Sequence, residues 1–102
     1  MELTVLERLL LLQLLPAKGA LTMIRVMHEL RQELGFSEEE LRLLQFKQEG
    51  DQLRWEDKNA PVKKIRLGPK AREAIEAQLK QLNEAGGVTE AHLSLFDKFL
   101  KE

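Results

Sequence analysis

Few side chains in this sequence could carry out catalysis or bind a metal, and their spacing matches no reactive pattern. The chain has no cysteine, and therefore no thiol nucleophile, thiolate metal ligand or disulfide. His28 precedes Glu29, but no second histidine follows four residues after the first, as the zinc-protease pattern requires. Serine occurs only at Ser37 and Ser94, without an evident base. We therefore expect no enzyme, no catalytic or metal-binding residue and no cofactor.

Positive charge is concentrated between residues 54 and 72. The whole chain has a net charge of −1, yet this segment holds an excess of basic side chains. They form a candidate basic binding patch of Arg54, Lys58, Lys63, Lys64, Arg66, Lys70 and Arg72. Such a patch fits an acidic protein partner, or a nucleic-acid backbone bound with little sequence reading. It also fits a solvated strand face whose lysines discourage aggregation, and the sequence leaves these alternatives open.

Negative charge is concentrated in the stretch GFSEEELRLL at residues 35–44. Ser37 and Glu40 have the spacing of a capping box, which predicts a short helix over about 38–45. Glu38, Glu39 and Glu40 then occupy its first turn, where they complement the helix dipole and form a candidate acidic surface. Because carboxylates repel phosphates, we expect that this helix does not read DNA bases, even within a helix-turn-helix geometry.

The first helix is predicted to be the centre of the fold. Thr4 and Glu7 form a capping box, and Pro16 prevents the helix from continuing. Its own leucine side chains project from almost every side of this helix. We therefore expect the helix to be mostly buried, with a thin polar edge at Glu7, Arg8 and Gln13.

The residues after the third helix change to a strand pattern. Gly50-Asp51 suits a two-residue hairpin turn, which would place Phe46 opposite Trp55. We expect these aromatic rings in the core, or at an interface if the sheet face is uncovered. Alternation over residues 63–67 predicts a third strand, with Lys64 and Arg66 facing outward.

Two helices are expected over residues 69–101. Proline at the first helical position marks one start at Pro69, and Thr89 is placed to cap the other. The last helix has an apolar stripe that predicts a homodimer as one option; the candidate dimer stripe consists of Leu93, Phe96, Phe99 and Leu100.

Three short helices followed by a β-hairpin resemble the winged-helix arrangement over residues 4–67. The predicted fold class is α+β: a winged-helix-like three-helix core with a small antiparallel sheet, plus two C-terminal helices, in a single domain over residues 1–102.

The chain also resembles a loose group of short, uncharacterised phage and prophage proteins. The resemblance is carried by LTVLERLLLLQLLP, LGFSEEE, KQEGDQLRW and TEAHLSLFDKF. It implies a phage context and supplies no activity or catalytic residue.

The first hypothesis for function is a small non-enzymatic binding protein that acts through protein contacts as a regulator or accessory factor. One alternative is a DNA-binding regulator that uses a basic wing, and another is a structural or assembly component. The longest apolar run has only four residues, Leu9–Leu12, so we expect no membrane partner and a cytoplasmic location.

Overall fold

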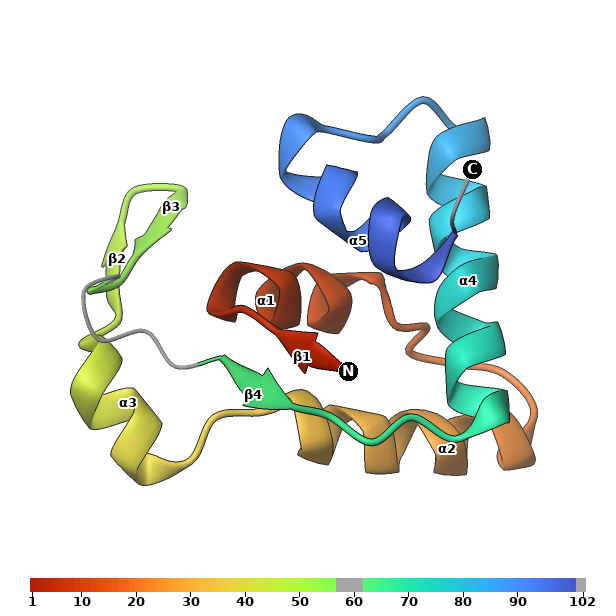
Figure 1. The fold of residues 1–102 in the computed structure, drawn as a ribbon, viewed down its shortest axis with the longest axis horizontal. Helices are drawn as coiled ribbons and strands as arrows, with labels where there is room; N and C mark the ends of the chain where they lie inside the picture. Colours follow the sequence, from red (N-terminus) through yellow and green to blue (C-terminus); the bar gives the residue numbers. More distant parts are fainter. Residues whose placement is uncertain (57–61, 101–102) are drawn as a thin grey trace.

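The computed structural model describes residues 1–56 and 62–100, and it has an α+β architecture (Figure 1). In chain order, its elements are β1 (Glu2–Leu3), α1 (Val5–Leu14), α2 (Leu21–Leu34), α3 (Glu38–Leu44), β2 (Lys47–Glu49), β3 (Gln52–Arg54), β4 (Lys63–Lys64), α4 (Pro69–Glu84), the 3-10 helix η2 (Glu90–His92) and α5 (Leu93–Phe99).

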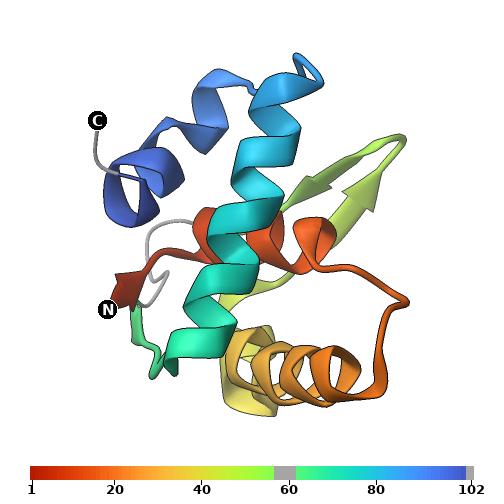
Figure 2. The same ribbon diagram turned by 90° about the vertical axis from the view of Figure 1, so that its right-hand side faces the viewer.

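The core lies between α1, α2, α4 and α5. Helix α1 is in the centre, α2 runs below it, α4 crosses beside both, and α5 covers α1 from above (Figures 1 and 2). The largest buried cluster draws its side chains from all four helices and from β1 and the segment after β4: Leu3, Leu11, Leu15, Met27, Leu30, Leu34, Ile65, Ala74, Ile75, Leu79, Leu95 and Phe99. Helices α4 and α5 thus share one core with α1 and α2.

Local sequence signals set the starts of α1, α3 and α4. Capping boxes precede α1 at Thr4 and α3 at Ser37, and Pro69 occupies the first turn of α4, as predicted. None of the helices within the described part of the chain is long and apolar enough to span a membrane.

The predicted hairpin is present, and its register pairs Gln48 with Leu53 as expected. The expectation of one small sheet is wrong, because β4 pairs with β1 in a separate antiparallel sheet. The reason is burial: Leu3 and Ile65 both enter the core, and the Ile65 amide donates to the Met1 carbonyl at 2.7 Å.

The predicted polar edge of α1 is also wrong at two of its three positions. The side chains of Glu7 and Arg8 are buried, with 2% and 0% of their surface exposed, whereas Gln13 is exposed. A helix covered on nearly every side by the rest of the fold has no solvated edge for these residues. Both charges therefore have partners inside the protein, which are described below.

Candidate functional site

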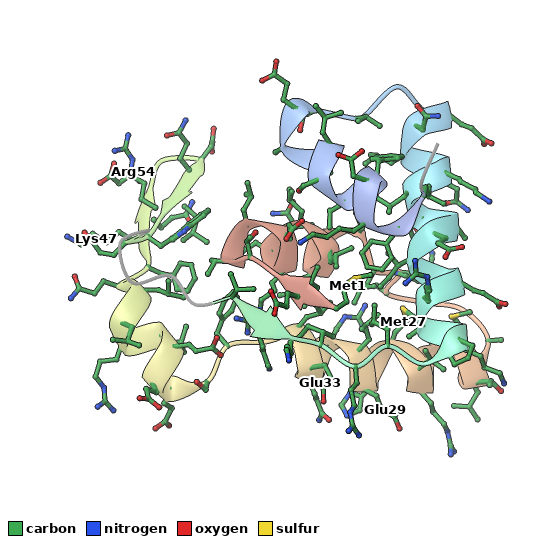
Figure 3. The ribbon with its side chains drawn as sticks, in the orientation of Figure 1. Met1, Met27, Glu29, Glu33, Lys47 and Arg54 are labelled. Atoms are coloured by element: carbon green, nitrogen blue, oxygen red, sulfur yellow. The ribbon has the colours of Figure 1, made fainter. Side chains whose placement is uncertain are left out.

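The candidate basic patch does not form one surface. Lys64, Arg66 and Lys70 are exposed along the segment that leads from β4 into α4. Arg54 lies on the hairpin, at the opposite side of the molecule from α4, and its Nε is 3.1 Å from the Glu49 carboxylate (Figures 1 and 3). The prediction for Lys58 lies outside the described residues.

Two other members of the predicted patch have structural partners. Lys63 is half-buried, and its Nζ donates to the Glu33 carbonyl at 2.7 Å. Arg72 pairs with Glu76 at 3.1 Å and lies over the Phe99 ring at 5.5 Å. These contacts attach β4 to α2 and connect α4 with α5.

Only two of the three carboxylates of the candidate acidic surface are exposed. Glu38 and Glu39 are exposed, but Glu40 is turned toward the protein interior, where an Arg8 nitrogen lies 2.6 Å from its carboxylate. The hydrogen bond from Arg8 lowers the pKa of Glu40 from 4.5 to about 2, against the opposing effect of burial.

Arg8 is the most completely enclosed charge of the described chain. Besides Glu40, its guanidinium donates to the carbonyls of Leu34, at 3.0 Å, and Gly35. It also stacks over the Phe36 ring at 4.0 Å. These partners come from the end of α2 and from the start of α3, so Arg8 holds the α2–α3 turn against α1. A charge this well paired serves the fold.

The candidate dimer stripe is divided between core and surface. Phe99 is 4% exposed and belongs to the core, so it cannot face a second copy in this structure. Leu93 is 57% exposed, while Phe96 and Leu100 are half-buried. The stripe prediction is therefore wrong for Phe99, because α5 uses this residue to pack on the rest of its own chain.

Three of the five aromatic residues form a small half-buried cluster beside α3. Phe36 and Phe46 meet edge to face at 5.2 Å, and Phe46 and Trp55 are 6.0 Å apart. The pair predicted from the hairpin register is therefore present, and it packs outside the main core.

A groove lies between α2 and α4, which we call the α2–α4 groove. It consists of two adjoining cavities of about 720 and 510 Å³ that share Val26 and Lys70. The first, here the charged end, is lined by Val26, Glu29, Leu30, Gln32, Glu33, Arg66, Gly68, Pro69, Lys70 and Ala71. The second, the apolar end, is lined by Ala20, Thr22, Met23, Val26, Lys70, Glu73, Ala74 and Ala77.

Charges of both signs border the charged end. Glu29 and Glu33 are one helical turn apart on α2 and project from its outer side (Figure 3), whereas Arg66 and Lys70 come from the segment that enters α4. All four side chains are exposed, and none forms an ion pair with another residue that the structure describes.

Small side chains create the apolar end. Ala74 and Ala77 leave space on α4, where larger residues would fill the gap to α2. Met23, which lines this end, is 37% exposed. The sequence did not predict that the groove residues of α2 and α4 meet. The three-residue spacing of Ala71, Ala74 and Ala77 is the available signal.

The groove combines apolar area with exposed charges of both signs. Within residues 1–56 and 62–100, no group of three or more histidine, aspartate or glutamate residues could hold a metal ion. Apolar area and well-placed charges are what protein recognition uses. Comparison with protein-family models, with curated proteins and with solved structures gave no match. The resemblance to phage and prophage proteins stays a prediction.

Proposed function

We propose that this chain is a small non-enzymatic binding protein that contacts a partner protein through the α2–α4 groove, as a regulator or accessory factor. The observation that carries the proposal is the groove itself, which joins an apolar end to an end bordered by exposed charges of both signs. Burial of apolar surface supplies the main driving force for association, and charges supply orientation and partner choice.

A DNA-binding regulator with a winged-helix-like core is the second candidate. It is favoured by the exposed row of Lys64, Arg66 and Lys70. It is less well supported because Glu29 and Glu33 line the same cavity as Arg66 and Lys70, so a duplex there would meet like charge. Fluorescence anisotropy with a random duplex at about 50 and 200 mM salt tests this candidate: binding that collapses at the higher salt would favour it.

Affinity capture with groove variants tests the first proposal. Ala77→Trp fills the apolar end from an exposed position of α4. Gly68→Trp fills the charged end, where an added Cβ meets no atom within 4 Å and the backbone φ of −70° suits any residue. Gln52→Trp, on the exposed hairpin far from the groove, is the matched control.

The proposal predicts at least one protein retained from cell lysate by the unmodified chain and by Gln52→Trp. Both groove variants should lose it while keeping their circular dichroism spectrum and unfolding midpoint. A captured set that is identical for all four baits would contradict the proposal. Capture lost through Gln52→Trp alone would move the binding surface to the hairpin.

A further inference from the structure

We infer that the occupant of the α2–α4 groove is an amphipathic helix of a partner protein, with acidic residues along one flank of its apolar stripe and basic residues along the other. This inference rests on the proposed function and adds the chemistry of the partner.

The nature of the groove walls favours a helix over an extended segment. Along the apolar end the walls are the side chains of α2 and α4, whose backbone groups are hydrogen-bonded within each helix. An extended peptide there would bury amide and carbonyl groups without partners, which is costly. A helix satisfies its own backbone and presents only side chains. Its apolar stripe would lie on Val26, Ala74 and Ala77.

The charges at the charged end of the groove determine which charges the two flanks of the partner helix must carry. One wall presents Glu29 and Glu33 from α2, and the other presents Arg66 and Lys70. A helix lying between these walls meets carboxylates on one side and cations on the other. Its own flanks must therefore carry opposite signs, and a helix with two like flanks would meet repulsion on one wall.

Both walls are held in place before any partner arrives. Lys63 ties β4 to the end of α2 through the Glu33 carbonyl, at 2.7 Å. Strand β1 holds the same segment from its other side, through the amide of Ile65 and the carbonyl of Met1. A groove that is already formed loses little conformational entropy on binding.

Designed helical peptides take the place of the partner helix and test the inference directly. Each is a stapled helix of about 20 residues with one leucine stripe, because shorter isolated helices are marginal. The first has glutamates on one flank and lysines on the other, the second has glutamates on both, and the third has lysines on both. A flank-swapped peptide is not a control, since reversing its direction in the groove restores the match.

Binding is measured by fluorescence anisotropy at low and high salt. We expect the mixed-flank peptide to bind the unmodified chain roughly three- to tenfold more tightly than either like-flank peptide, as exposed ion pairs are individually weak. The preference should shrink at high salt. Glu29→Lys with Glu33→Lys should transfer the preference to the all-glutamate peptide, and Arg66→Glu with Lys70→Glu to the all-lysine peptide.

The groove variants separate the inference from the proposed function. Binding of the mixed-flank peptide should be lost in Ala77→Trp and kept in Gln52→Trp. Equal affinity for all three peptides, still blocked by Ala77→Trp, would overturn the inference on flank charge and leave the groove as a protein-binding site. Peptide binding that is unchanged in Ala77→Trp and Gly68→Trp, or no binding of any of the three peptides, would overturn the inference. The proposed function would then be decided by the capture experiment alone. Self-association of the chain that Ala77→Trp abolishes would assign the groove to a second copy and overturn the partner helix.

Discussion

The N-termini of α1 and α3 use the same capping motif, and in both cases the glutamate of the motif has a second task. Glu7 accepts a hydrogen bond from the amide of its own N-cap residue at 2.9 Å, and Glu40 does the same at 3.0 Å. Each carboxylate also meets a cation from a distant helix: Lys98 at 2.7 Å from Glu7, and Arg8 at 2.6 Å from Glu40. A local motif is thereby converted into a tertiary link.

The two links differ in how completely the charges are paired. Arg8 is fully buried and makes four hydrogen bonds, two of them to carbonyl oxygens. Glu7 is almost as deeply buried, but its Oε2 accepts no hydrogen bond from the described residues, and its partner Lys98 is 34% exposed. Because an incompletely paired buried charge is expensive, the α3 link is the stronger of the two.

The largest effect is expected from Arg8→Ala. The change removes all four hydrogen bonds and leaves the Glu40 carboxylate facing an apolar gap, so the free energy of unfolding should fall by about 3–5 kcal/mol. Urea denaturation measures it, with the exposed Arg25→Ala as the control, expected within about 0.5 kcal/mol of the unmodified chain. An Arg8→Ala effect as small as that of the control would show that the Arg8–Glu40 link does not stabilise the fold.

Glu40→Gln is expected to cost less, about 2–3 kcal/mol at neutral pH, because the amide oxygen can still serve the cap. The folded pKa of Glu40, about 2, lies below the ordinary value of 4.5, so its stabilising contribution is present above about pH 4.5 and is lost as pH falls toward 2. Unfolding free energies measured across this pH range should fall steeply for the unmodified chain. A variant with an equally steep fall would place the titrating group elsewhere.

Lys98→Met tests the weaker link and should cost about 1–2 kcal/mol, because hydrogen bonds to a charged group are lost at a partly exposed site. Burial raises the pKa of Glu7, and the neighbouring donors Lys98, Thr4 and Ser94 together bring it below its ordinary value. Without Lys98 the first effect should dominate, so this pKa should rise. NMR titration of the carboxyl group follows it directly, and an unchanged value would mean that Lys98 contributes nothing.

The smallest effect is expected from Glu7→Gln, about 1 kcal/mol or less, since the change keeps the cap and removes a charge that lacks one partner among the described residues. Thermal unfolding of Glu7→Gln beside Lys98→Met measures the two sides of this link separately. If Glu7→Gln were the more damaging of the two, the Glu7 charge would contribute more to stability than its incomplete hydrogen bonding indicates.

Features of the fold that depend on residues close together in the chain could be predicted from the sequence. The capping boxes at Thr4 and Ser37, the start of α4 at Pro69 and the hairpin turn at Gly50 depend on residues only a few positions apart. Their geometry follows from nearby backbone groups, whatever the rest of the fold does.

Features that depend on residues far apart in the chain could not be predicted from the sequence. Strand β1 has only two residues, too few for any period, and pairs with β4 about 60 positions later. The partners of Arg8 lie 26 to 32 positions away, so a charge within a leucine-rich helix was assigned to a solvated edge. The α2–α4 groove arises only when two helices pack, which no local pattern encodes.

Lys98 joins the C-terminal helix α5 to the N-terminal part of the chain, and this link has a consequence for the order of folding. Its ammonium reaches the Glu2 carbonyl as well as Glu7, at 2.7 Å each, and so spans more than ninety residues. During synthesis on a ribosome, α1 emerges long before Lys98 does. The Glu7 carboxylate therefore stays hydrated until α5 has been made. Docking of α5 is then a late, loop-closing event, because the groups that Lys98 joins are more than ninety residues apart.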